Sequence, residues 1–257
     1  MDIVIIAFVS FLASLLAFFS GFGLGTMLIP AFALFFPIDV AIILTSITHL
    51  LNNILKLFLI GKYADIAIVI FFGITSIIGA FIGAELFINL SNYDPILTYY
   101  IRNHQFEIIP INIIVSLLML FFSSMEIIPY LKNIKFDSKK LLIGGIISGF
   151  FGGLSGRQGA LRSAFLIKCG LSKESFIATG VILACLIDFT IIPIYLSNHK
   201  SIGIENDMNM LLTAVISAYV GTYIGNNLLG KIASNTLRYG IITTVVLIAI
   251  ALGLGLL

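Results

Sequence analysis

The sequence predicts an all-α integral membrane protein made of two inverted repeats, each with a re-entrant broken helix and three transmembrane helices. Three observations support this fold class. The chain of 257 residues is 60% hydrophobic and only 10% charged, whereas a soluble domain carries roughly 25% charged residues. Its apolar residues form eight segments that cover almost the whole chain. A glycine-rich break interrupts one segment in each half of the chain.

The first repeat is predicted to span residues 1–130. Its first apolar segment, 3–36, is too long for one span, because a spanning helix needs about 20 apolar residues. The run from Ser20 to Gly25, followed by Pro30, interrupts it. Non-helical backbone at membrane depth survives only where protein or a water-filled cavity surrounds it. The segments 39–60, 65–88 and 108–130 each fit one span.

The second repeat is predicted to span residues 131–257. Segment 141–169 is again too long for one span, and it contains the glycine-rich run from Gly152 to Gly159. The segments 174–196, 208–230 and 236–257 each fit one span. Laying Gly25 on Gly159 places Thr45 on Thr179 without a gap. Paired interruptions in two corresponding halves are typical of a secondary transporter whose binding site lies at the breaks.

Two pairs of small residues extend this correspondence. After the longer loop at 197–207, Gly79 and Gly83 lie on Gly221 and Gly225. Glycines four residues apart on a membrane helix predict that a neighbouring helix approaches closely. Two such pairs at matching places favour a duplicated chain.

The distribution of basic residues predicts the topology, since cytoplasmic loops carry an excess of Lys and Arg. If all eight segments cross, the basic residues divide almost evenly between the two sides. If both broken segments turn back, most basic residues share one face, which is then cytoplasmic. The residues on that face are Lys62, Lys132, Lys135, Lys139, Lys140, Lys168, Lys173, Lys231 and Arg238. We therefore expect a multi-pass protein of the plasma membrane with basic loops in the cytoplasm and both termini outside.

Composition also excludes several classes of function. A net charge of +2 is too small to indicate nucleic-acid binding. Cys169 and Cys185 lie in apolar surroundings without metal or redox spacing, so we expect them to be packing residues. Neither glycine run has the spacing of a phosphate-binding loop. We expect no cofactor and no metal, a lipid bilayer around the chain, and a homodimer as one possible assembly.

The second break carries a resemblance to a known family. The glycine-rich break followed by a proline, the repeated half, and the stretch from Ser155 to Leu166 (SGRQGALRSAFL) resemble the sulfite exporter TauE/SafE family of membrane transporters. The resemblance covers nearly the whole chain, although Arg157 and Gln158 stand where the family pattern has glycines. It implies export or uptake of a small anion that often contains sulfur, such as sulfite, a sulfonate or an organosulfur acid.

Two arginines at the second break are candidate ligands for such an anion. An Arg within a membrane segment usually faces a cavity or a partner. Arg162 lies in the first turn of the helix expected to start at Gly159, whose N-terminus offers free N–H groups and a positive dipole end. Together with Arg157 it would bind an oxyanion through bidentate hydrogen bonds. The alternative is that each Arg pairs with a carboxylate or extends to the cytoplasmic face. The candidate substrate-binding residues at the two breaks are Gly21, Gly23, Gly25, Ser155, Gly156, Arg157, Gln158, Gly159 and Arg162.

A polar stripe runs along the segment 39–60. His49, Asn52, Asn53 and Lys56 recur at helical spacing, with Thr45 one turn earlier. We predict that His49, Asn52 and Asn53 line the substrate path, because such groups are costly in lipid. The alternative is that they form hydrogen bonds between helices. Lys56, near the cytoplasmic end, could instead extend to the interface.

Asp188 is the only acidic residue deep within the spans of the second repeat. Three roles remain open for it: a counter-ion for Arg157 or Arg162, a carrier of the coupling proton, or a partner in a purely structural ion pair.

The competing class is an intramembrane serine protease that uses Ser155. The run from Gly153 to Gly156 matches the G-x-S-G of rhomboid-like proteases, and His49 supplies a histidine in a span. That family needs a catalytic histidine in a later span, however, and His199 is the only later one and lies in a loop. We therefore expect the chain not to be an enzyme.

Overall fold

A computed structural model describes residues 2–20, 24–102, 104–127, 140–198, 204–227 and 235–256. In the first half, the elements are α1 (Asp2–Ser20), α2 (Leu24–Ala33), α3 (Ile38–Ile60), the short 3-10 helix η1 (Gly61–Tyr63), α4 (Ile66–Ser91), β1 (Leu97–Ile101), β2 (His104–Ile108) and α5 (Pro110–Ile127). In the second half, they are α7 (Leu141–Ser155), α8 (Gly159–Leu166), α9 (Lys173–Asn198), α10 (Ile204–Asn227) and α11 (Asn235–Gly253). The predicted boundary between the repeats, 130/131, lies outside the described residues.

The helices agree with the apolar segments of the sequence. Within the described part of the chain, four helical stretches are long and apolar enough to cross a membrane: Ile38–Tyr63, Ile66–Ser91, Lys173–Ser197 and Met208–Gly225. Shorter apolar helices lie in α1, α2, α5, α7 and α11. Both long segments are divided into two helices, as the glycine-rich runs predict. Pro30 does not contribute to the first break, because it lies inside α2, which continues to Ala33.

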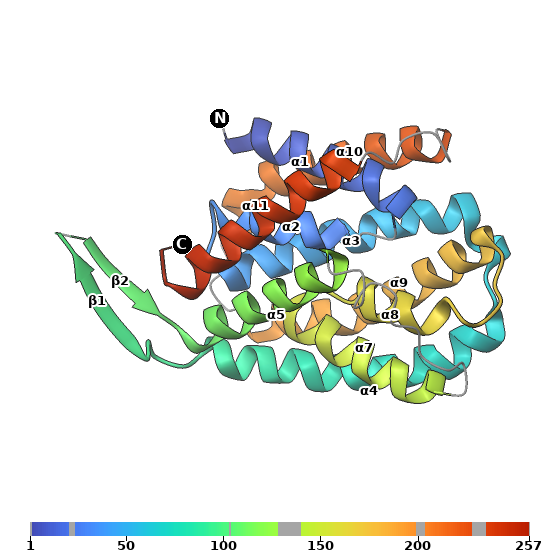
Figure 1. Cartoon of the computed structure of the whole chain (residues 1–257), viewed down its shortest axis with the longest axis horizontal. Helices are drawn as coiled ribbons and strands as arrows, with labels where there is room; N and C mark the ends of the chain where they lie inside the picture. The colour runs from blue at the N-terminus through green and yellow to red at the C-terminus, as the bar shows by residue number, and fades with distance from the viewer. Residues whose placement is uncertain are drawn as a thin grey trace.

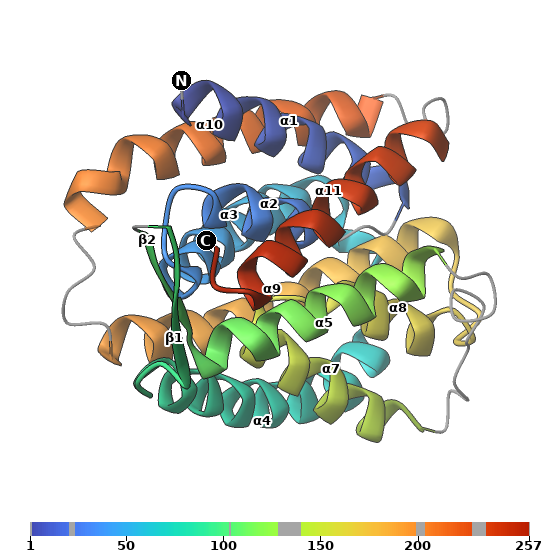
Figure 2. The same ribbon diagram turned by 60° about the vertical axis from the view of Figure 1, so that its left-hand side comes forward.

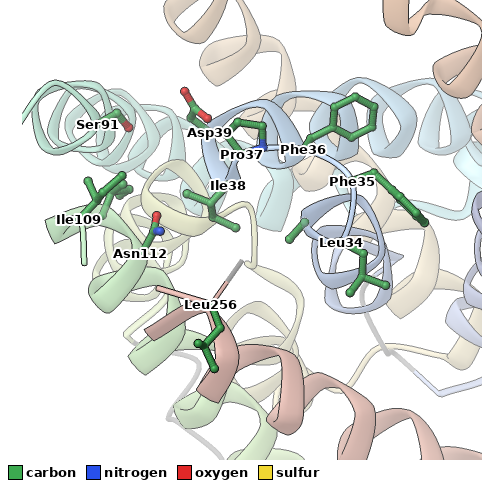
Figure 3. Close-up of a pocket in the computed structure, with 12 residues that line it drawn as sticks. Leu34, Phe35, Phe36, Pro37, Ile38, Asp39, Ser91, Ile109, Asn112 and Leu256 are labelled. Carbon is green, nitrogen blue, oxygen red and sulfur yellow. The ribbon is translucent and has the colours of Figure 1, made fainter. Parts of the chain in front are cut away.

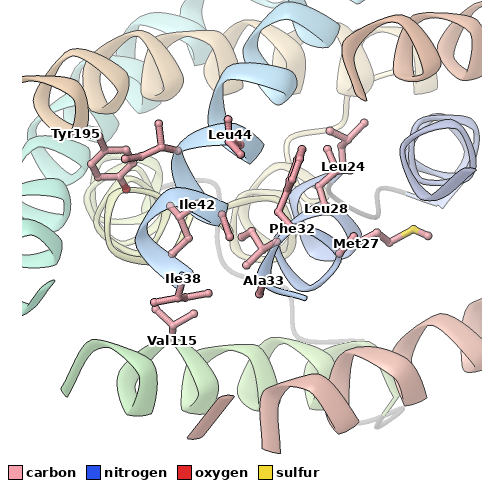
Figure 4. Close-up of a cluster of buried hydrophobic side chains, with 14 of the residues drawn as sticks. Leu24, Met27, Leu28, Phe32, Ala33, Ile38, Ile42, Leu44, Val115 and Tyr195 are labelled. Carbon is pink, nitrogen blue, oxygen red and sulfur yellow. The ribbon is translucent and has the colours of Figure 1, made fainter. Parts of the chain in front are cut away.

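Helices α2 and α3 form the centre of the molecule (Figures 1 and 2). All ten residues of α2 are buried. They pack with the first part of α3, with α5 and with Tyr195 of α9 in the largest hydrophobic cluster (Figure 4). The outer helices α4 and α10 instead expose large apolar side chains such as Phe71, Phe81 and Ile216. This distribution suits lipid outside and packed protein inside.

Two close helix pairs hold the molecule together. Figure 2 shows α1 beside α10 along one side and α4 beside α7 along the opposite side. On α4, a Cβ added at Gly79 or Gly83 would collide with backbone carbonyl oxygens of α7. On α7, a Cβ added at Gly149 or Gly153 would collide with carbonyl oxygens of α4. We call this glycine-lined contact the α4–α7 interface.

The pair α1 and α10 repeats the arrangement. A Cβ added at Gly221 of α10 would collide with the carbonyl oxygen of Phe11 of α1. The predicted close approach is therefore confirmed at Gly79, Gly83 and Gly221. Each pair joins the broken segment of one half to a long helix of the other half. Further helix pairs also cross between the halves, among them α3 with α9, α4 with α9 and α5 with α11.

A β-hairpin that sequence analysis did not predict projects from one end of the molecule (Figure 1). Its strands pair antiparallel, with Leu97 opposite Ile108 and Tyr99 opposite Phe106. The Tyr99 hydroxyl donates a hydrogen bond to the Leu254 carbonyl oxygen, which ties the hairpin to the end of α11. The strands are too short to be found in a search for 20-residue apolar runs, although β-branched and aromatic residues favour a strand there.

Candidate functional site

The breaks of the two halves contact each other at the centre of the molecule. Helix α7 ends at Ser155, and Gly156 adopts the left-handed conformation with φ 67°. This conformation lets the Gly156 N–H bond the Gly152 carbonyl at 2.8 Å, a common way to end a helix. A Cβ added at Gly25, at the start of α2, would lie 3.0 Å from the Gly156 carbonyl oxygen. Gly21 and Gly23 lie outside the described residues.

The non-helical backbone of the second break is surrounded by protein. Tyr195 of α9 donates a hydrogen bond from its hydroxyl to the Gly153 carbonyl oxygen. This bond satisfies one of the carbonyl groups that a helix end leaves without an intrahelical partner. Beside Gly156 lie Ile29 of α2 and Ile42 of α3. As predicted, α8 starts at Gly159, directly after Gln158.

Ser155 is fully buried, and its hydroxyl donates a hydrogen bond to the Phe151 carbonyl oxygen at 2.9 Å within α7. A serine nucleophile instead needs its hydroxyl bonded to a general base. His49, the histidine considered for that role, bonds Asp188 and Asn53. The geometry therefore offers no support for the protease hypothesis.

The structure directs the two candidate arginines toward different helices. Arg157 is 5% exposed, and its guanidinium carbon lies 5.7 Å from the ring centroid of Phe122 of α5. Arg162 instead points toward α9, where its Nε lies 3.5 Å from the position a Cβ would take at Gly180. Its Nη1 donates a long hydrogen bond of 3.4 Å to Gln158 Oε1.

A largely buried charged cluster lies between α3, α8 and α9. We define the charged cluster as His49, Asn53, Lys56, Arg162 and Asp188. His49 Nδ1 lies 2.6 Å from Asp188 Oδ2. The Asn53 amide nitrogen lies 3.2 Å from both ring nitrogens of His49. Arg162 interacts electrostatically with Asp188 and with Lys56.

The contacts within this cluster bear on two questions that the sequence left open, namely the partner of Asp188 and the position of Lys56. Asp188 is 2% exposed and bonds directly to His49, a partner that sequence analysis did not consider. Lys56 does not extend to the interface, because only 6% of it is exposed. The i, i+4 and i+7 spacing of His49, Asn53 and Lys56 was the signal that these side chains share one helix face.

Asn52 lies outside this cluster and contacts a different helix. Its side-chain oxygen accepts a hydrogen bond of 2.7 Å from the Thr222 hydroxyl of α10. The polar stripe of α3 therefore divides between two neighbours, α9 and α10. For Asn52 the structure gives the interhelical hydrogen bond that was the alternative to lining a path.

A pocket of about 540 Å³ opens at the end of the molecule that carries the β-hairpin (Figure 3). Its walls come from the turn between α2 and α3, the end of α4, the start of α5 and the end of α11. Asp39, Ser91 and Asn112 supply its polar groups. Between this pocket and Gly156 lie Ile38 and Ile42, one turn apart on α3. Sequence analysis missed the pocket because its lining residues lie in separate segments without a shared motif.

Residues 6–252 match the model of the sulfite exporter TauE/SafE family, so the chain belongs to this family. Comparison with curated proteins and with solved structures finds no match. Members of the family are membrane transporters of sulfur anions such as sulfite rather than enzymes. The family and the apolar helices together define a multi-pass membrane protein.

Proposed function

We propose that the chain is a secondary transporter that moves a small sulfur-containing anion by alternating access at the two glycine-rich breaks. Sulfite, a sulfonate and an organosulfur acid are the candidate substrates. The observation that carries the proposal is the contact between Gly25 and Gly156. It brings the breaks of both halves to one place, with Arg157 and Arg162 directly after the second break. Breaks that meet in this way are typical of the substrate sites of transporters built from repeats.

The pattern of helix contacts supports an inverted-repeat arrangement. If α1, α2, α3, α4 and α5 correspond in order to α7, α8, α9, α10 and α11, a two-fold relation requires every contact to have a counterpart. The contact of α4 with α7 has its counterpart in α10 with α1, and α4 with α9 has α10 with α3. Helices α3 and α5 contact their own counterparts, α9 and α11, as elements next to a two-fold axis do.

In this proposal the anion binds between the two breaks and the charged cluster. Arg162 donates hydrogen bonds to it, and the N-terminus of α8 adds backbone N–H groups. Arg157, whose guanidinium lies over Phe122 in this structure, turns toward the anion to donate as well. His49, Asn53 and Gln158 line the site. Asp188 balances the positive charge or carries the coupling proton through its bond with His49. Ile38 and Ile42 of α3 separate the anion from the pocket at the β-hairpin end of the molecule.

Exchange of labelled anions in proteoliposomes tests the proposal. We expect the purified protein to exchange at least one of sulfite, methanesulfonate and sulfoacetate faster than empty liposomes. Arg157→Lys keeps the positive charge but loses the planar guanidinium, which can donate two parallel hydrogen bonds to an oxyanion. We therefore expect this variant to bind substrate more weakly by about 1–3 kcal/mol. Arg102→Lys, on the exposed turn of the β-hairpin, is the matched control and should behave as wild type.

Two outcomes would contradict these expectations separately. If no sulfur oxyanion exchanges above the rate of empty liposomes, the transport proposal fails. If transport proceeds but Arg157→Lys and Arg157→Ala both bind substrate with wild-type affinity, Arg157 has only the packing role against Phe122 that its position over the ring suggests.

A further inference from the structure

The pocket at the β-hairpin end is lined by a buried amide whose side chain has no hydrogen-bond partner. Asn112 is 6% exposed, lies in the first turn of α5 and borders the pocket of about 540 Å³ (Figure 3). Its side-chain amide makes no hydrogen bond to any residue of the described ranges. A polar group that is buried but faces a cavity is normally completed by a ligand or by ordered water.

The start of α5 supplies further hydrogen-bond donors to this pocket. The N–H groups of Asn112 and Ile113 both bond the Ile109 carbonyl oxygen, at 3.1 and 3.3 Å, and Pro110 has no N–H. A helix leaves its first N–H groups without intrahelical partners, so the N–H of Ile111, which also lines the pocket, remains. No acidic residue lies in the first turn of α5. This side of the pocket therefore suits an oxyanion group.

The other polar side of the pocket has the opposite electrostatic character. Asp39, in the first turn of α3, presents a carboxylate whose Oδ1 accepts the Val40 N–H at 2.9 Å. Ser91 is the last residue of α4, and its hydroxyl donates to the Phe87 carbonyl oxygen. The C-terminal end of a helix is the negative end of its dipole. Figure 3 shows Asp39 and Ser91 on one side of the pocket and Asn112 across from them, so their side suits a cation.

We propose that this pocket binds a small aminosulfonate, whose sulfonate accepts hydrogen bonds from Asn112 and the start of α5 and whose ammonium group bonds Asp39. This inference rests on the proposed function for the sulfonate, and it deepens that function by naming a zwitterionic substrate class. A simple anion would leave the carboxylate side without a counter-charge, and a simple cation would leave the amide without an acceptor. The walls formed by Phe35, Ile109 and Leu256 suit a short hydrocarbon link between the two charged groups.

A fluorescence reporter in the pocket tests this binding in the purified full chain. The chain contains no tryptophan, so Phe35→Trp, at the pocket wall, gives a single source of indole emission. We expect 2-aminoethanesulfonate to change this emission. It should bind at least about tenfold more tightly than ethanesulfonate, which lacks the ammonium group. Phe58→Trp, at a site of α3 that is 82% exposed and outside the pocket, is the control reporter and should not respond.

Two variants of the Phe35→Trp chain separate the two ends of the ligand. Asp39→Asn keeps an oxygen for the Val40 N–H but loses the charge, so the preference for the aminosulfonate should fall to within about twofold. Asn112→Leu has a similar volume without the amide and should weaken both sulfonates at least about fivefold. Asp94→Asn, at an exposed carboxylate outside the pocket, is the matched control and should leave both affinities unchanged. The result for Asp39→Asn decides the matter if Asn112→Leu does not fold.

The outcomes separate this inference from the transport proposal. Equal affinity for the two sulfonates, or no change in the emission of the pocket reporter, overturns the zwitterion site. A preference that survives Asp39→Asn overturns the role of Asp39, and unchanged affinity in Asn112→Leu means that only water completes the amide. Exchange of sulfur anions without a response of the reporter leaves transport standing and removes this site. A response of the reporter in a protein that exchanges no sulfur anion supports the site and contradicts the transport proposal alone.

Discussion

At the scale of single residues, the contact between His49 and Asp188 is the most consequential feature. Their atoms lie 2.6 Å apart, and Asp188 is almost fully buried. A buried carboxylate bonded to a histidine can share a proton with it, and intramembrane groups of this kind are frequent in proton relays. In the repeat alignment proposed from the sequence, Asp188 lies on Ile54, so one half would have a titratable group where the other has none.

Asp188→Asn distinguishes a coupling role from charge balance. If Asp188 carries the coupling proton, the variant imitates the protonated carboxyl, so the protein folds and uptake driven by a pH gradient stops. Exchange at equal substrate concentrations should continue, because it needs no net movement of protons. If Asp188 only balances Arg162, the variant leaves a buried cation uncompensated and lowers the yield of folded protein. Both transport modes are measured on one proteoliposome preparation, and wild-type gradient-driven uptake would rule out coupling by Asp188.

The sequence indicates candidate functional residues more readily than it indicates which side chains they contact. The positions of His49, Asn53, Arg162 and Asp188 in apolar segments mark them as functional candidates, since such groups are costly in lipid. Their mutual contacts depend on how α3, α8 and α9 pack. The spacing of residues along one helix does not indicate which other helices it packs against. For the same reason the sequence could not tell that Arg157 lies over Phe122.

At the scale of elements, segment length and glycine content predict most of the helices. The observed helices fall within a few residues of the predicted spans, because the thickness of the bilayer fixes the number of apolar residues. The break before α8 was predicted from the glycine-rich run at 152–159, although Gly152 and Gly153 themselves lie inside α7, which ends only at Ser155. Pro30 was misleading, since a helix with well-packed surroundings tolerates a proline.

The α4–α7 interface allows a test at this scale. Gly149→Ala places a methyl group against the Ser76 carbonyl oxygen, and backbone atoms cannot rotate away as a side chain would. We expect the free energy of unfolding to fall by about 1–3 kcal/mol, although alanine favours the isolated helix. Gly240→Ala should not lower stability, because its added Cβ meets no atom within 4 Å. Thermal unfolding in detergent compares the two variants, and equal midpoints would contradict the close approach.

At the scale of the whole molecule, most of the described contacts between helices pair a helix of one half with a helix of the other half. In Figure 1 α7 and α9 both begin at the right-hand end, opposite the β-hairpin. If the second broken segment is re-entrant, the chain enters α7 and leaves α8 on the same side of the membrane. For that arrangement the positive-inside rule predicts a cytoplasmic side at this end of the molecule.

Cysteine labelling tests this topology in a chain whose own Cys169 and Cys185 are replaced by serine. Cysteines at Lys140 and Ser172, which flank the second broken segment and are exposed, should react with an impermeant thiol reagent only after permeabilisation. A cysteine at Gln105, on the β-hairpin, should react in intact cells. Labelling of Lys140 and Ser172 from opposite sides would mean that the segment crosses the membrane, and the inverted-repeat proposal would fail.

The packing of α1 against α10 has a consequence for the timing of biogenesis. Helix α1 ends at Ser20, and its partner begins at Ile204. At a ribosome speed of about 5–20 residues per second, α10 is synthesised roughly 10–40 seconds after α1. During that interval the surface of α1 that receives Gly221 faces lipid or a membrane chaperone. Helix α1 therefore acquires this neighbour only late in synthesis.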